Sequence, residues 1–346
     1  MTVTINDIAK KSGVSLATVS RVINKSPHVS DRVKDKVVNA IKELNYIPNA
    51  YARGLSKNCS NIIGVIIPEI TNPFFSEIIK GITEIGDKQD LNVLLFNSDE
   101  NLIKEERAIR ILQEYRIQGL IITPVTGSNE YDKEYIKLFE NLKMPIVLMD
   151  RSIINGHFDG IYFDDHAALF KMTSLLLENG HQEIVLFTGN PNHVISKIRV
   201  SGYVDAFNAH GIAVNRKNLI PGEFSIESAY SLTKKMIVNQ NLPTAFLCMT
   251  NMISMGCLKA LYEYNVSIPE EIAFAGYDRL EMLDVLHLKL TLVEKDAQEM
   301  GRRAATLLID KLSGNSLSNR TILMPELYIR GSEKFPVRDP NKRDLI

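Results

Sequence analysis

The sequence predicts a small all-α headpiece of helix-turn-helix type, followed by an α/β core of two lobes, each built on a doubly wound parallel sheet. Residues 5–24 fit two short helices around a glycine turn, whereas from Asn61 onward apolar strands alternate with amphipathic helices. The second part, roughly 285 residues, exceeds one doubly wound unit, which predicts two lobes with a ligand cleft between them.

The headpiece begins with two helices. Ile5, Ile8 and Ala9 recur at helical spacing and give the first helix one apolar face. Gly13 can adopt the positive φ of a tight turn, and Ser15 can cap the helix that follows. The second helix turns three apolar residues inward, namely Val19, Val22 and Ile23.

A third helix over residues 32–44 completes a headpiece of residues 1–47, because Val33, Val37 and Ile41 lie on one apolar stripe. Residues 48–60 are predicted to form a linker with a short hinge helix. Such a short helix is marginal in water, so we expect this segment to be disordered until a partner orders it.

Charge is divided unevenly along the chain. The first 60 residues hold ten Lys and Arg against four Asp and Glu, a net +6, whereas the remainder carries −7. A local basic excess favours binding to phosphate groups. The second helix presents Leu16, Ala17, Ser20 and Arg21 outward, a face suited to the major groove of DNA. Two helices at the start of an ordinary domain are the alternative interpretation.

The core is predicted from buried strands and the helices between them. Residues 62–67 form a fully apolar strand, as expected for a parallel sheet covered on both faces. Further strands are predicted at 93–96, 119–122, 146–149, 184–187, 245–248 and 272–275, and helices at 75–89, 105–115, 166–179 and 255–264.

Composition excludes several classes of protein. Hydrophobic residues make up 45% of the chain, yet no apolar run approaches a membrane span, and no signal segment is recognisable. Cys59, Cys248 and Cys257 lack metal-ligand spacing and are expected to be reduced and structural. We therefore expect a cytoplasmic protein without a metal or a cofactor.

No catalytic motif is found. The chain lacks a Gly-x-Ser-x-Gly elbow, a His-Glu-x-x-His zinc helix and a glycine-rich dinucleotide motif. The stretch from Gly81 to Lys88 lacks the lysine directly after glycine that a phosphate loop requires. We expect no enzymatic activity and no catalytic residue.

Residues 2–60 resemble the headpiece of the lactose/purine repressor family of bacterial transcription regulators, the LacI/GalR type. The resemblance rests on an ordered series of short motifs. They are Asp7-Ile8-Ala9, Gly13-Val14-Ser15, Thr18-Val19-Ser20-Arg21-Val22, Val29-Ser30 and Leu44-Asn45-Tyr46-Ile47-Pro48-Asn49-Ala50-Tyr51-Ala52-Arg53-Gly54-Leu55.

The remainder is similar to the same family, through motifs such as Asn72-Pro73-Phe74-Phe75, Asp150-Arg151 and Gly276-Tyr277-Asp278. This resemblance implies a periplasmic-binding-protein-like core over residues 61–334, followed by a polar tail over 335–346. The chain is expected to cross between lobes near residues 150–160, 284–289 and 319–324. The first lobe then spans about 61–155 and 288–320, and the second about 156–287 and 321–334.

Residues for DNA binding follow from their chemistry and from the family pattern. Arg21 can bridge two guanine acceptors, and Leu16 and Ala17 suit thymine methyl groups. Leu55 is expected to wedge into the minor groove; packing of this leucine on the core is the alternative. Phosphate contacts are expected from Thr4, Ser15, Thr18, Ser20, Asn24, His28 and Tyr46, and hinge or minor-groove contacts from Asn49, Ala50, Ala52, Arg53 and Leu55.

Effector residues follow the predicted strand ends. Phe74 and Phe75 can stack on a sugar or a base. Carboxylates and a guanidinium suit the hydroxyls of a sugar or sugar phosphate, although each charge could instead form an interlobe salt bridge. Glu294-Lys295-Asp296 stands where the family commonly has a glutamine-proline pair, so no effector contact is predicted there. The polar effector-binding residues expected from the family pattern are Asp150, Arg199, Asn251 and Asp278.

The resemblance implies a homodimeric repressor of carbohydrate-use genes that binds a pseudo-palindromic operator and is nucleoid-associated when bound. Effector binding is expected to change the angle between lobes and thereby the order of the hinge. A purine, a nucleoside or a partner protein is the alternative signal. A transport-type sugar-binding protein and a sugar-processing enzyme are the alternatives of other classes. The tail lacks a leucine heptad, so no coiled-coil tetramer is expected.

Overall fold

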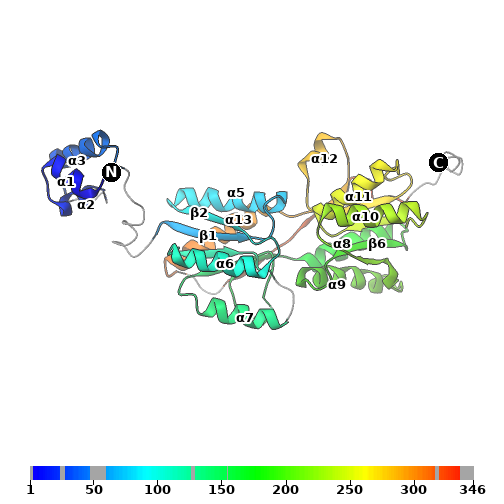
Figure 1. Ribbon diagram of the computed structural model, residues 1–346. Helices are drawn as coiled ribbons and strands as arrows, with labels where there is room; N and C mark the ends of the chain where they lie inside the picture. Colours follow the sequence, from blue (N-terminus) through cyan, green and yellow to red (C-terminus); the bar gives the residue numbers. More distant parts are fainter. Residues whose placement is uncertain are drawn as a thin grey trace. The chain divides into compact units, whose positions relative to one another are not determined.

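The computed structural model describes residues 3–23, 28–46, 60–125, 129–153, 155–315 and 319–335. The chain divides into two compact units, Met1–Asn61 and Ile62–Ile346, which are described separately below (Figure 1). Cys59, Asn24 and the five predicted hinge residues, Asn49, Ala50, Ala52, Arg53 and Leu55, lie outside the described residues.

The first unit is the predicted helix-turn-helix headpiece. It contains α1 (Ile5–Ser12), α2 (Leu16–Ile23) and α3 (Asp31–Glu43). Gly13 ends α1 with φ of 68°, which confirms the predicted turn, and the Thr18 amide donates to Ser15 Oγ at 3.2 Å, which confirms the predicted cap. The three helices meet around the fully buried side chains of Ile8, Val19 and Val37 and the small residue Ala40.

The second unit contains two sheets, as predicted, and each has six strands among the described residues. All strand pairs are parallel except the one between β10 and β12, which is antiparallel. The first sheet has the order β11 (Arg320–Leu323), β5 (Gly160–Phe163), β4 (Ile146–Met149), β3 (Gly119–Ile122), β1 (Ile62–Ile67), β2 (Asn92–Asn97). The second has the order β12 (Glu326–Tyr328), β10 (Thr291–Glu294), β9 (Ala273–Tyr277), β8 (Ala245–Cys248), β6 (Ile184–Gly189), β7 (Leu219–Pro221).

Helices cover both faces of each sheet, which buries the apolar strands (Figure 1). On the first lobe these are α5 (Pro73–Lys88), α6 (Leu102–Glu114), α7 (Asn129–Glu140) and α13 (Ala297–Leu312). On the second they are α8 (Asp165–Glu178), α9 (Val194–Ala209), α10 (Ile226–Val238), α11 (Asn251–Glu263) and the short α12 (Glu281–Val285), with a 3₁₀ turn at Arg216–Asn218.

Three helix pairs pack most extensively: α5 with α13, α8 with α9, and α10 with α11. A glycine permits the close approach within each pair. A Cβ added at Gly301 of α13 would lie 2.1 Å from the carbonyl oxygen of Ile78 in α5. A Cβ at Gly202 of α9 would lie 2.3 Å from the carbonyl oxygen of His166 in α8.

The sheet memberships correct the predicted positions of the lobe crossings. The strand β5 pairs with β4 in the first sheet, so the first crossing follows Phe163 instead of lying within 150–160. The strand β10 belongs to the second sheet, so the second crossing follows Glu294 instead of lying within 284–289. The third crossing lies between Leu323 of β11 and Glu326 of β12, at the end of the predicted range of 319–324. The short strands β5 and β10 were not among the predicted strands, so the first two crossings were placed before them.

Among the described residues, no helix is long and apolar enough to cross a membrane. Cys248 and Cys257 are buried free thiols of the second lobe, where burial raises the pKa of Cys248. Both side chains pack within its apolar core, in agreement with the structural role expected for them.

Candidate nucleic-acid interface and effector site

The three side chains predicted to read bases lie together on the exposed side of α2. Leu16 is 47% exposed, which is unusual for a large apolar residue, and Ala17 and Arg21 are also exposed. Val19, on the opposite side of the same helix, is fully buried. Packing therefore fixes which face of α2 is presented outward, as a recognition helix requires.

The residues predicted to contact phosphate are more varied in their surroundings. Thr4 donates from its amide and its hydroxyl to Asp7 at 2.8 and 2.7 Å, and these bonds lower the pKa of Asp7. The hydroxyls of Ser15 and Thr18 lie 2.9 Å apart, so they are placed side by side at the start of α2. Of the other three that the structure describes, His28 is exposed, Ser20 is half-buried, and Tyr46 packs against the headpiece core.

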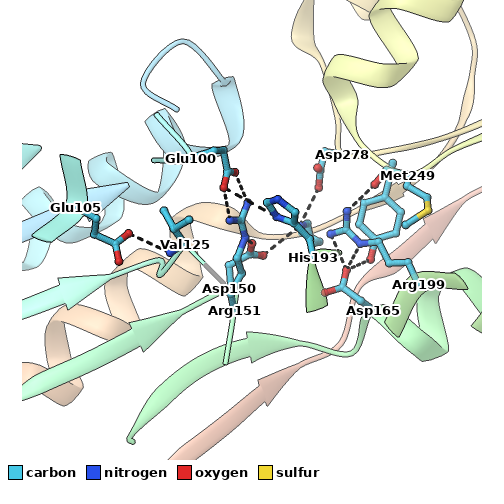
Figure 2. A network of polar contacts seen from close by, with 12 residues as sticks. Glu100, Glu105, Val125, Asp150, Arg151, Asp165, His193, Arg199, Met249 and Asp278 are labelled. Atoms are coloured by element: carbon cyan, nitrogen blue, oxygen red, sulfur yellow. Dashed lines mark hydrogen bonds and ion pairs between the residues drawn. The ribbon is translucent and has the colours of Figure 1, made fainter. Parts of the chain in front are cut away.

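A buried lysine joins the two lobes of the second unit. Lys295 follows β10 at the second crossing, and only 1% of its side chain is exposed. Its Nζ lies 3.5 Å from Oδ1 of Asp150 and 3.4 Å from Oδ1 of Asp278. Asp150 follows β4 of the first sheet and Asp278 follows β9 of the second (Figure 2). One ammonium group therefore contacts both lobes.

Aromatic rings complete the surroundings of this ammonium group. Nζ of Lys295 lies 3.8 Å from the ring centre of Phe74, 5.2 Å from that of Phe163 and 5.3 Å from that of Tyr277. All three distances fall within the range of cation–π attraction. Phe74 and Phe163 belong to the first lobe and Tyr277 to the second, so the rings, like the carboxylates, come from both sides.

Both aspartates turn the chain sharply at the end of a strand. Asp150 has φ of 61° and Asp278 has φ of 62°, in the left-handed region that residues with a Cβ seldom adopt. Such backbone strain clusters at functional sites. The carboxyl ends of parallel strands are also where α/β proteins place their ligands. Both features indicate a binding site between the lobes.

The two carboxyl groups have different electrostatic surroundings. Burial alone would raise the pKa of Asp150, but the charges of Lys295, Arg199 and Arg151 together hold it below its ordinary value. Burial raises the pKa of Asp278 above its ordinary value despite the same lysine. Asp150 is therefore the more firmly ionised of the two.

Arg199 lies within the second lobe and orders its neighbours. Its Nε and Nη2 donate to Oδ1 of Asp165 at 3.0 and 2.9 Å, and its Nη1 donates to the carbonyl oxygen of Met249 at 2.6 Å (Figure 2). The guanidinium lies 4.3 Å from the ring centre of Tyr277, whose hydroxyl also donates to Asp165. An effector that contacts Arg199 would have to share donors already engaged here.

Two further polar contacts join the lobes. Nδ2 of Asn251, at the start of α11, donates to Oδ1 of Asn72, the N-cap of α5, at 2.8 Å. Arg151 holds Glu100 by two hydrogen bonds of 2.8 and 2.6 Å, and Nδ1 of His193 lies 4.0 Å from the same carboxylate (Figure 2). Burial and Arg151 lower the pKa of His193, which favours its neutral form.

The lobes leave little free space beside this cluster. A cavity of about 170 Å³ adjoins it and is smaller than the roughly 300–1,000 Å³ typical of ligand pockets. No group of acidic, histidine or cysteine side chains suited to a metal ion is found among the described residues. The cavity is lined from both lobes, by residues that include Asp150, Phe163, Asp165, Ile195 and Ile198.

The structure thus brings four predicted effector residues to the junction: Phe74, Asp150, Asn251 and Asp278. Arg199 lies within the second lobe, where its guanidinium packs against the ring of Tyr277. Phe75 packs in the core of the first lobe, with its ring edge-on to Phe74 at 5.2 Å. The sequence prediction missed Lys295, Phe163 and Tyr277. Two signals pointed to Lys295: a charged side chain just after an apolar strand, and the departure of Glu294-Lys295-Asp296 from the glutamine-proline pair common in the family.

An exposed recognition helix joined to a two-lobed ligand-binding fold defines a DNA-binding transcription regulator, and the comparisons agree. Residues 4–49 match the bacterial regulatory proteins of the lacI family. Residues 60–332 match the periplasmic binding proteins and sugar binding domain of the LacI family. The chain belongs to the lacI family of bacterial regulatory proteins. Members are transcriptional regulators and not enzymes, and this chain is a DNA-binding transcriptional repressor of that family.

Individual relatives extend over nearly the whole chain. The HTH-type transcriptional repressor PurR of Pasteurella multocida is 32% identical over 333 residues, which cover 96% of this chain and 98% of the relative. The Lac repressor dimer bound to operator and the anti-inducer ONPF has a TM-score of 0.84 at 26% identity, covering 96% of this chain and all of that one. A LacI family regulator from Enterococcus faecium with bound ribose has a TM-score of 0.69 at 27% identity, covering 80% and 100%.

Proposed function

We propose that this chain is an effector-controlled repressor that binds a pseudo-palindromic operator as a homodimer and receives its effector between the two lobes. The observation that carries the proposal is the convergence of Asp150 and Asp278 from the strand ends of two different sheets. Buried carboxylates at such a junction make ligand binding depend on the angle between the lobes. The ordering of the hinge segment by DNA would then couple that angle to the headpiece.

On the DNA, Arg21 is proposed to read guanine, with Leu16 and Ala17 against thymine methyl groups. Their common exposure on α2 supports these roles. The phosphate and hinge contacts predicted above are proposed with them, since they set register and bending while carrying little sequence information themselves.

A homodimer is supported by an exposed apolar surface on the second lobe. Met282 and Val285 of α12 are 64% and 71% exposed, and Leu286 and Leu288 just after it are 59% and 43% exposed. Contiguous apolar side chains of this size mark interaction surfaces in proteins. Pairing of this surface with its copy would give the two-fold symmetry that a pseudo-palindromic operator requires.

For the effector, we propose a sugar or sugar phosphate, and hence control of carbohydrate-use genes. The carboxylates of Asp150 and Asp278 can accept hydrogen bonds from hydroxyls, and the ring of Phe74 can stack on a sugar face. The relative with bound ribose supports this choice. A purine or nucleoside is the second candidate, because the relatives named PurR are similar over nearly the full chain.

The proposal is tested with the full-length protein in two steps. Duplexes that bind it are first selected from a random pool, and we expect a two-fold symmetric motif with affinity that falls steeply with salt. Sugars, sugar phosphates and purines are then screened by thermal shift, since a ligand of the native fold raises the Tm. A pool without an enriched motif would refute the operator proposal. A panel in which only purines raise the Tm would replace the sugar by the second candidate.

A further inference from the structure

We propose that the interlobe cleft contains a built ammonium-binding site, that Lys295 is its resident ligand, and that this internal ligand holds the two lobes together. The inference rests on the proposed function only in taking the cleft as the effector site. It adds the chemical group that binds between Asp150, Asp278 and Phe74 within the cleft, a primary alkylammonium, and the residue that supplies this group in the absence of effector.

The geometry is that of cation recognition. Nζ of Lys295 has carboxylate oxygens of Asp150 and Asp278 at 3.5 and 3.4 Å and the ring of Phe74 at 3.8 Å. Opposite charges and aromatic faces together are the means by which proteins bind ammonium groups. The side chain of Lys295 is 1% exposed, so its charge has been removed from water and depends on these partners.

The contacts of Lys295 are divided between the lobes. Asp150 and Phe74 belong to the first lobe, whereas Asp278 and Tyr277 belong to the second. Movement of the lobes apart would strip the ammonium group of one half of its partners. Without the ammonium group, two buried carboxylates would face each other across the junction, and their repulsion would favour opening. Lys295 therefore acts as a charged bridge whose presence favours the closed arrangement.

An external effector must displace this bridge. The ammonium group of Lys295 already lies within ion-pair distance of Asp150 and Asp278 and against the ring of Phe74, and the cavity of about 170 Å³ adjoins this position at Asp150. A ligand with a primary ammonium group can replace Lys295 and restore both ion pairs with Asp150 and Asp278. A ligand without a positive charge can offer these two carboxylates only hydrogen bonds.

Chemical rescue provides the test. Lys295→Ala removes the equivalent of propylammonium from the site, so propylammonium is the probe and 1-propanol its neutral control. Lys171→Ala, at an exposed position of α8, is the matched control variant. We expect propylammonium at ten times its Kd to raise the Tm of full-length Lys295→Ala by on the order of 2 °C. We expect no such rise with 1-propanol, or in wild type and Lys171→Ala. A folded Lys295→Ala that propylammonium does not stabilise more than 1-propanol would overturn the inference.

A second variant covers the case in which Lys295→Ala does not fold. Lys295→Met keeps the apolar stem without the charge, and we expect a lower Tm than wild type because the two carboxylates lose their cation. Adding Asp278→Asn to Lys295→Met should then recover part of that loss, since it removes one of the facing charges. A double variant with a lower Tm than Lys295→Met alone would exclude an electrostatic bridge at this position.

These outcomes are separable from those of the proposed function. Rescue by propylammonium reports on the site around Lys295 alone and requires neither DNA nor a natural effector. If rescue succeeds while no sugar or purine binds wild type, the effector proposal fails and the ammonium site stands. If rescue fails while a sugar raises the Tm of wild type, the ammonium site is refuted and the effector proposal stands.

Discussion

A single exposed guanidinium on α2 is expected to contribute much of the DNA specificity. Arg21→Ala should weaken binding to the selected duplex by roughly 10- to 100-fold, because a good bidentate contact with guanine contributes about 1–3 kcal/mol of discrimination. Fluorescence anisotropy with the full-length protein measures this. Lys171→Ala, on the second unit, is the control and should bind as wild type does. Equal affinity of Arg21→Ala and wild type would show that Arg21 does not read the operator.

A buried carboxyl group of the first lobe makes stability depend on pH. Burial raises the pKa of Glu105 to about 7, despite hydrogen bonds from the Tyr135 hydroxyl and the Val125 amide. Figure 2 shows the bond from Val125. The folded pKa exceeds the ordinary 4.5, so this contribution is fully present below pH 4.5 and is lost as the pH rises through 7. The loss approaches about 3 kcal/mol.

Glu105→Gln tests this contribution, because glutamine resembles the protonated acid and can serve both hydrogen-bond partners. The variant should lack the fall in stability that wild type shows between pH 5 and 8. Denaturant unfolding at several pH values measures the difference, which should grow as the pH rises. A constant difference across that range would contradict the raised pKa.

At the residue scale, the sequence identified the aspartates but not the cation between them. Asp150 and Asp278 each follow an apolar strand, so the position of each at the carboxyl end of its own sheet, facing the cleft between the lobes, could be predicted from topology. Lys295 could not be placed in the same way. Its partners stand far from it in the sequence, and its burial depends on how two lobes close around a crossing segment. No local pattern encodes that closure.

At the scale of elements, packing of α5 against α13 depends on a small residue at the contact. Gly301→Ala would place a methyl group 2.1 Å from the carbonyl oxygen of Ile78, so the helices must separate. We expect a loss of roughly 1–3 kcal/mol, typical of overpacking, although alanine favours a helix over glycine by about 1 kcal/mol.

Thr306→Ala, at an exposed position of the same helix, is the control and should change stability by less than about 0.5 kcal/mol. Equilibrium unfolding of both variants measures the comparison. A Gly301→Ala protein as stable as wild type would show that the pair tolerates a wider separation.

The fully buried apolar strands and strongly amphipathic helices were predictable, whereas the more polar edge strands were not. β1, β3, β4 and β8 coincide with predicted ranges, because burial on both faces requires continuous apolar residues. Edge strands such as β11 and β7 carry only four and three residues beside polar turns. Whether such a strand joins a sheet is decided by hydrogen bonding to a neighbouring strand, and the pattern of apolar and polar residues does not predict this bonding.

At the scale of the whole molecule, the exposed apolar residues of α12 predict self-association. Val285→Glu should shift the protein from dimer toward monomer in sedimentation and weaken operator binding, because a charge would be buried in the interface. Tyr262→Glu is the matched control, since Tyr262 is also strongly exposed, at 87%, but lies on α11. A Val285→Glu protein that remains dimeric would place the interface elsewhere.

The central claim is that occupancy of the interlobe cleft controls the headpiece. The most direct measurement is the Kd for the selected duplex, with and without the compound that raises the Tm most, in wild type and in Asp150→Asn. We expect the compound to change the Kd of wild type by about 5- to 150-fold, the usual range of allosteric coupling, and to act more weakly on Asp150→Asn. An unchanged Kd at saturating compound would show that the cleft and the DNA-binding face are independent.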